Sequence, residues 1–159
     1  MKEELLKSWK GRSRENIKKY KIFLNRIDKT KAIRILPVLH QEAFKKINCL
    51  DCAACCKNYS PRFKTPDIKR ISKYLRMKEG DFIETYLKVD EDKDFVVKTA
   101  PCPFLGDDNH CMVYEARPKA CREYPHTDRK KMVQIMDLTY KNTLVCPAVL
   151  EMVERLKKI

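Results

Sequence analysis

Four of the eight cysteines lie within one octet of the sequence, Cys49-Leu50-Asp51-Cys52-Ala53-Ala54-Cys55-Cys56. Thiolates at two-residue gaps are typical of sites for soft metals, because short loops bring the sulfur atoms together around one ion or cluster. A hydrophobic core would use Ala, Val or Leu as readily as Cys. The octet therefore predicts metal binding, and the metal ligands that we expect are the octet's four thiols and four more downstream: Cys49, Cys52, Cys55, Cys56, Cys102, Cys111, Cys121 and Cys146.

The spacing of the first three thiols favours an iron–sulfur cluster over zinc. Cys49-x2-Cys52-x2-Cys55 is the close-spaced triad of iron–sulfur ferredoxins, in which a distant Cys-Pro supplies another ligand. The chain has two such pairs, Cys102-Pro103 and Cys146-Pro147. Zinc fingers and ribbons normally pair two Cys-x2-Cys knuckles, whereas here the knuckles overlap on one side only. Zinc remains the alternative.

The adjacent pair Cys55 and Cys56 argues against a single mononuclear ion. Neighbouring side chains diverge in a helix and face opposite ways in a strand, so the two thiols do not easily grip one ion. The simplest partition has two groups of four thiols, and a single cluster with spare thiols is the competing arrangement. One plausible split is Cys49, Cys52, Cys55 and Cys146 against Cys56, Cys102, Cys111 and Cys121.

Cationic side chains surround one thiol. Arg117 and Arg122 bracket Cys121, and we expect them to bind the cofactor by donating hydrogen bonds to sulfur. Ordinary surface arginines are the competing interpretation. A histidine could replace a thiol as ligand, although each of the three is more typical of a structural role: His40, His110 and His126.

Composition and charge limit the classes of function that are possible. The chain has 159 residues and a net charge of +13, and the first 46 residues hold fourteen Lys/Arg against five Asp/Glu. We expect residues 1–46 to form a basic helical extension that packs on a cysteine-cluster metal-binding domain, residues 47–159. Only three glycines occur, so no glycine-rich nucleotide loop is present. No catalytic residue can be assigned, since neither a HExxH pair nor a Ser/His/Asp pattern is found.

Hydropathy predicts a cytoplasmic protein. No apolar run resembles a signal peptide or a membrane span. In a reducing compartment, eight cysteines are metal ligands more often than disulfides.

The periodicity predicts a mainly α fold with a small β-hairpin, in a compact irregular domain organised by the metal site. We expect Ser13 to cap a helix over residues 14–27, and Pro37 to kink or restart a second helix over residues 31–47. Thr65 is the expected cap of a helix that Gly80 ends. Cys146 is the expected cap of the last helix, which starts at Pro147.

The expected hairpin lies around the Gly106 turn. Residues 95–99 form one predicted strand and residues 110–114 the other. Pairing across this turn would bring Cys102 and Cys111 together.

The cysteine motifs also resemble a known family. Cys49-x2-Cys52-x2-Cys55-Cys56, then Pro101-Cys102-Pro103-Phe104-Leu105, then Cys111-Met112-Val113-Tyr114-Glu115-Ala116-Arg117-Pro118-x2-Cys121-Arg122-x-Tyr124-Pro125, is similar to the CxxCxxCC cysteine-cluster family. That YkgJ-like family is described as a zinc- or iron-chelating domain. The resemblance covers roughly residues 47–147 and implies metal chelation by the eight cysteines. It extends to the cysteine-rich part of flagellin lysine N-methylases, which are thought to carry an iron–sulfur cluster.

Three function classes follow. The first is a metal-binding protein that holds an iron–sulfur cluster or zinc, with a redox or structural role and a protein partner or electron donor still to be identified. The second is a redox-assisted protein lysine N-methylase, which the resemblance alone implies. The third is a zinc-stabilised basic module that binds nucleic acid or an acidic partner through residues 1–46.

Overall fold

The computed structural model describes residues 2–159, with the side chains of residues 2–6 and of Val133 excepted. The fold is mainly α-helical with one small antiparallel hairpin, which confirms the predicted class. Backbone contacts divide the chain into two units: unit 1, Met1–Cys52 with Pro125–Ile159, and unit 2, Ala53–Tyr124. The predicted functional boundary at residue 46 stays a prediction, since backbone contacts do not show where metal binding begins.

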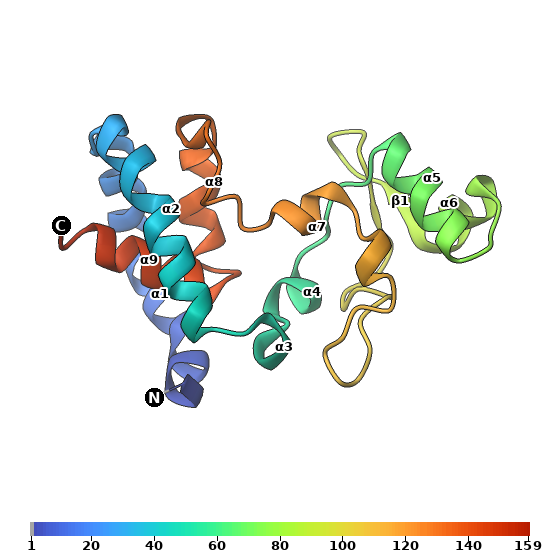
Figure 1. Ribbon diagram of the computed structural model, residues 1–159, viewed down its shortest axis with the longest axis horizontal. Helices are drawn as coiled ribbons and strands as arrows, with labels where there is room; N and C mark the ends of the chain where they lie inside the picture. Colours follow the sequence, from blue (N-terminus) through green and yellow to red (C-terminus); the bar gives the residue numbers. More distant parts are fainter. Residues whose placement is uncertain (1) are drawn as a thin grey trace. The chain divides into compact units, whose positions relative to one another are not determined.

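Unit 1 combines the two ends of the chain, drawn in blue to blue-green and in dark orange to red in Figure 1. Its helices, with the 3-10 helix η2, are α1 Lys2–Arg26, α2 Lys29–Lys46, α3 Cys49–Cys52, η2 Met132–Ile135, α8 Met136–Asn142 and α9 Pro147–Leu156.

Helix α9 is the centre of unit 1. It packs against α1, α2 and α8, and its side chains from Ala148 to Leu150 are buried almost completely. Helix α2 meets it with buried residues at helical spacing, including Leu36 and Leu39. Each fully buried Leu or Val contributes about 1.5–3 kcal/mol, so this packing holds the ends of the chain together.

Ser13 does not cap a helix. Helix α1 runs without a break through this position, and the Ser13 hydroxyl is buried against α8, where its Oγ lies 2.7 Å from Thr143 Oγ1. Helix α2 begins after Asp28, whose Oδ1 accepts a 2.7 Å hydrogen bond from Lys31 N, and it continues through Pro37 without restarting.

Unit 2 contains short elements joined by long loops. Its elements, with the 3-10 helix η1, are α4 Ala54–Asn58, α5 Thr65–Tyr74, α6 Glu79–Tyr86, β1 Leu87–Val89, β2 Phe95–Val97, η1 Tyr114–Ala116 and α7 Lys119–Glu123.

One apolar cluster holds unit 2 together. Helices α5 and α6 contribute Ile68, Ile71 and Phe82, and the loop after β2 contributes Phe104. The rings of Phe104 and Phe82 stack with their centroids 6.1 Å apart. Aromatic pairs of this kind add to the burial of large apolar side chains, so the loop is fixed to the helices by its own side chains.

The hairpin lies earlier in the chain than predicted. Strands β1 and β2 pair antiparallel, with Leu87 opposite Val97, around the acidic turn 90–94. Around Gly106 only a single bridge forms, between Leu105 and Cys111. Prolines 101 and 103 lack the N–H groups that a ladder needs, which explains why no second hairpin extends from this bridge.

Two expected helix ends were also wrong. The N-cap of α5 is Lys64, not Thr65, and the backbone N–H of Lys64 donates to Asp67 Oδ2 at 3.0 Å. Gly80 does not end a helix but lies in the first turn of α6. Helix α5 instead stops at Tyr74, where the chain reverses through Arg76 at a positive φ of 56°.

Candidate metal centre

The eight predicted ligands divide between the two units. Unit 1 contains Cys49, Cys52 and Cys146, which we call the unit 1 thiols. Unit 2 contains Cys55 together with a group that we call the unit 2 thiol set: Cys56, Cys102, Cys111 and Cys121.

Backbone contacts bring three of the four segments of the unit 2 thiol set together, those of Cys56, Cys102 and Cys111. Cys102 N donates a 2.8 Å hydrogen bond to Cys56 O, which joins the loop after β2 to helix α4. The bridge between Leu105 and Cys111 folds the next segment back onto this loop. Cys121 follows in α7, where its N–H donates to Pro118 O at 2.9 Å. Four separate segments of one unit therefore contribute one thiol each.

Apolar side chains next to the thiols anchor these segments. Phe104 and Val113 each follow a cysteine of the set by two residues, and both are buried in the apolar cluster of unit 2. Cys102 and Cys111 themselves pack partly against that cluster. The core thus fixes the positions of both thiols.

The thiols of the set lie near enough to affect one another's ionisation. The pKa of Cys102 is raised to about 11 and that of Cys121 to about 12, chiefly by burial and also by the negative charge of a Cys56 thiolate. Burial followed by the Cys56 charge also raises the pKa of Cys111. Four thiolates in this place would repel one another unless a cation lay among them.

Cys56 is the member of the set that ionises first. Its Sγ lies 4.0 Å from Cys55 Sγ, and the hydrogen bond from that thiol is the main cause that lowers the pKa of Cys56 to about 7. The charge of Lys57 acts in the same direction. Thiolates are the form in which Cys binds metal, and a ligand role for Cys56 stays a prediction.

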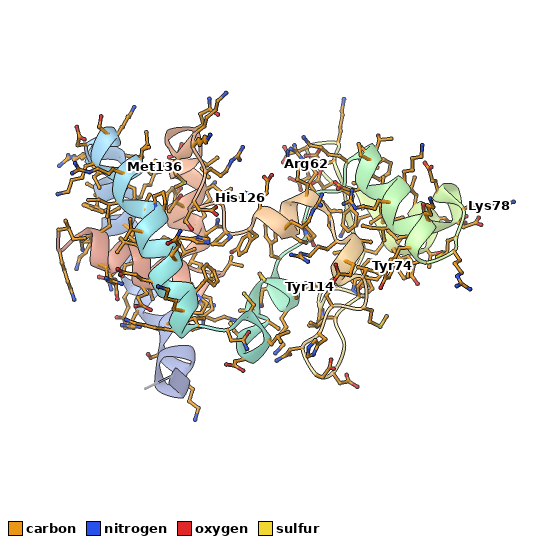
Figure 2. All side chains as sticks on the ribbon, viewed as in Figure 1. Arg62, Tyr74, Lys78, Tyr114, His126 and Met136 are labelled. Carbon is orange, nitrogen blue, oxygen red and sulfur yellow. The ribbon has the colours of Figure 1, made fainter. Side chains whose placement is uncertain are left out.

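Of the two arginines expected near the thiols, Arg117 lies near enough to affect the pKa of two of them. The Arg117 guanidinium lies 3.8 Å from the ring centroid of Tyr114, which Figure 2 labels, and its charge opposes the rise in the pKa of Cys111 and Cys121. Arg122 is an exposed residue of α7. Cofactor binding by either arginine stays a prediction.

Cys49 and Cys52 lie near enough to Cys146, at the start of α9, to affect its ionisation. Cys146 is the N-cap of that helix, as predicted, and Pro147 is its first residue. The pKa of Cys146 is raised to about 12, chiefly by burial and also by the charges of Cys49 and Cys52. Hydrogen bonds from the backbone N–H groups of Val149 and Ala148 act in the opposite direction. The helix start therefore offsets part of the cost of burying a thiolate at this position.

The histidines make other contacts. His40 Nδ1 lies 2.7 Å from Thr127 Oγ1, and its Nε2 faces Asp128 at 3.8 Å. His110 Nδ1 lies 3.2 Å from Asp108 Oδ2 on the exposed turn. These contacts give His40 and His110 structural partners.

The donor set fits a soft metal. Sulfur ligands from several segments of one chain select zinc and iron–sulfur clusters over hard cations such as Mg²⁺ or Ca²⁺. Among the described residues, no three Cys, His, Asp or Glu side chains stand in the arrangement that grips a single metal ion. The thiols lie near one another without forming a finished coordination sphere.

Over residues 48–146, more than half of its length, the chain matches the model of the CxxCxxCC family, described as a "putative zinc- or iron-chelating domain". The chain belongs to this family. Membership identifies it as a metal-binding cysteine-cluster protein, in agreement with the resemblance drawn from the motifs. The matched span covers the octet and ends at Cys146.

Other comparisons add no further relative. Searches of curated proteins and of solved structures gave no match. Among the described residues, no helix is long and apolar enough to cross a membrane.

Two residues that hold the Cys111–Cys121 segment in place were not predicted from the sequence. Asp67 and Arg70 of α5 contact the backbone of residues 116–119. Their spacing of three residues on one helix face is the only signal in the sequence, and such pairs usually lie in solvent.

Proposed function

We propose that this family member uses its cysteines to hold an iron–sulfur cluster in a redox role, with zinc in a structural role as the alternative. The observation that carries the proposal is the unit 2 thiol set, in which four segments of one unit contribute neighbouring thiols. The proposal includes a reducing compartment such as the cytoplasm, in which cysteines stay reduced and available to metal.

Electrostatics supports a bound cation in the unit 2 thiol set. Cys102 and Cys121 are disfavoured as thiolates by burial and by the neighbouring charge of Cys56. A metal or cluster neutralises the thiolates that bind it, so its binding removes this repulsion. The positive charge of Arg117 nearby acts in the same sense and is suited to an anionic cluster.

Ligand spacing favours the cluster over zinc. The triad Cys49-x2-Cys52-x2-Cys55 with a distant Cys146-Pro147 follows the ferredoxin pattern. The unit 2 thiols are singletons from four segments, whereas zinc ribbons use paired knuckles.

The two metals imply different roles. When bound, an iron–sulfur cluster supplies one-electron transfer at a potential that nearby hydrogen bonds and solvent exposure adjust. Zinc supplies no electron transfer and would serve the fold. Under the proposal, the chain's own part is to fix the thiols on the apolar cluster of unit 2 and to place Arg117 beside them.

Metal and sulfide analysis after purification without oxygen tests the proposal. We expect iron and acid-labile sulfide in equal amounts, with a visible absorption band that bleaches on reduction. Replacing Cys102 by Ser should remove iron and sulfide from the unit 2 thiol set, whereas Asp94→Asn, which breaks only the exposed Arg62–Asp94 ion pair, should not. Zinc without sulfide would establish the structural alternative, and a folded protein without any metal would refute both.

A further inference from the structure

The Asp67 carboxylate accepts hydrogen bonds from backbone N–H groups at the starts of two helices. Its carboxylate is almost completely buried, with an exposed fraction of 3% for the residue. Oδ2 accepts from Lys64 N at 3.0 Å at the start of its own helix, α5. Oδ1 accepts from Lys119 N at 3.0 Å, which is the first residue of α7. The same side chain therefore ties α5 to the helix that carries Cys121.

Arg70 completes the contact. Its Nη2 donates to Asp67 Oδ1 at 2.7 Å and to Arg117 O at 2.8 Å. Its Nε donates to Ala116 O at 3.2 Å. The planar guanidinium thus bridges the carboxylate and two consecutive carbonyl groups, a geometry that Lys cannot reproduce.

The contacted segment lies between two thiols of the unit 2 set. Residues 116–119 join Cys111 to Cys121, and Arg117 within them places its charge near both sulfurs. Val113 and Ala116 anchor the start of this segment in the apolar cluster, but none of the residues of α7 belongs to that cluster. The hydrogen bond from Lys119 N to Asp67 therefore holds the first turn of α7, and with it Cys121, to α5.

We propose that Asp67 and Arg70 are positioning residues for metal binding, which set Cys121 and Arg117 relative to Cys56, Cys102 and Cys111. The inference rests on metal binding by the unit 2 thiol set, as proposed above. Residues that orient metal ligands through hydrogen bonds change metal affinity by about 10–100-fold when they are replaced. A pair that served stability alone would change the unfolding temperature and leave the coordination of bound metal unaltered.

A proline at position 119 isolates the decisive hydrogen bond. Lys119→Pro removes the N–H that Asp67 accepts, and the first position of a helix tolerates proline. Pro118 already has the extended backbone, with φ −61° and ψ 153°, that a residue before proline requires. Lys119→Ala is the matched control, because both variants lose the exposed ion pair with Glu123 and only the proline variant loses the N–H.

The probe is Co²⁺, titrated into the reduced full-length protein and followed by its thiolate charge-transfer and d–d bands. We expect Lys119→Pro to bind Co²⁺ about tenfold more weakly than Lys119→Ala and to show shifted d–d bands at saturation. Adding Cys102→Ser to the control should weaken the same bands, which assigns them to the unit 2 thiol set.

The outcomes separate the two proposals. Equal Co²⁺ affinity and equal spectra in the two variants would overturn the positioning role and leave metal binding intact. No thiolate bands in the unaltered protein would overturn metal binding by this set, and the positioning role with it. If the proline variant does not fold, Arg70→Lys replaces it in the same titration: unchanged bands and affinity in a folded Arg70→Lys protein would equally overturn the role.

Discussion

The backbone N–H of Cys102 donates a 2.8 Å hydrogen bond to the carbonyl oxygen of Cys56. These residues are far apart in the sequence, and helices α5 and α6 with the hairpin lie between them. The contact joins the end of the cysteine octet to the first downstream cysteine. The helices and hairpin between the two residues contribute to the apolar cluster against which Cys102 and Cys111 pack.

Phe104 should be essential for the unit 2 thiol set. Its ring contacts those of Phe82 and Tyr86, with centroids 6.1 and 4.9 Å away. Replacing a buried Phe by Ala costs about 3–5 kcal/mol, a large part of the stability of a small domain. We expect Phe104→Ala to unfold at lower urea concentration and to lose metal during gel filtration.

Phe104→Leu is the matched variant for this prediction. It keeps an apolar side chain in the cluster and should retain metal with a smaller loss of stability. Equal metal retention and equal urea midpoints for Phe104→Ala and the unaltered protein would show that the cluster does not anchor Cys102.

Replacing Ala53 by Gly should have little effect, whereas replacing it by Val should disturb the local backbone. It lies between α3 and α4 with φ 44° and ψ 22°, in the left-handed region. This conformation costs an L-residue about 1–2 kcal/mol, whereas deleting one buried methyl group costs about 0.8 kcal/mol. Ala53→Gly should therefore be near neutral in the free energy of unfolding.

Ala53→Val places a β-branched side chain in the same conformation, which such residues rarely adopt. We expect it to shift the turn between Cys52 and Cys55 and to lower the amount of metal retained per chain. Metal analysis of the glycine and valine variants side by side checks this, and equal retention would contradict it.

Alkaline pH should destabilise the metal-free protein. The pKa is raised from 9.0 to about 12 in Cys121 and Cys146 and to about 11 in Cys102, with burial as the largest cause. A raised folded-state pKa means that the folded chain retains protons that the unfolded chain has lost. The stabilisation by these thiols is complete below pH about 9 and is lost as the pH rises towards about 12.

Two other groups also change the free energy of unfolding with pH, and the measurement must account for them. The pKa of Cys56 is lowered to about 7, so this thiol has the opposite effect: the folded protein gains stability as the pH rises from about 7 to about 9. Tyr20, with its pKa raised to about 12 by burial and by Glu154, adds to the alkaline loss from pH about 10 upwards. Urea unfolding in a Tyr20→Phe background removes this second contribution. A free energy of unfolding that stays constant between pH about 9 and about 11 would contradict the predicted thiol effect.

Local patterns predicted the elements that depend on neighbouring residues. The start of α9 at Cys146-Pro147 was predicted from capping preferences, and the mainly α class from the spacing of apolar residues. The cysteine octet and the downstream motifs predicted the family that the comparison shows. These features follow from interactions within a few residues of the chain.

Features that depend on tertiary partners were missed. Ser13 has the residue type of a cap, but its hydroxyl meets Thr143, which is 130 residues away in the sequence. The strand at Phe95 pairs with the segment before it because Val89 and Leu87 lie at the right distance across the acidic turn. Asp67 looked like a first-turn acid, and nothing in the sequence near it predicts the backbone of Lys119 as its partner.

Metal content per chain tests most directly whether the unit 2 thiol set binds metal. The measurement compares the protein purified without oxygen with a variant in which Cys56, Cys102, Cys111 and Cys121 are all replaced by Ser. In the quadruple variant we expect all the iron or zinc that this set binds to be lost. The Asp94→Asn control should retain the full amount. Unchanged metal content in a folded quadruple variant would contradict metal binding by these four thiols.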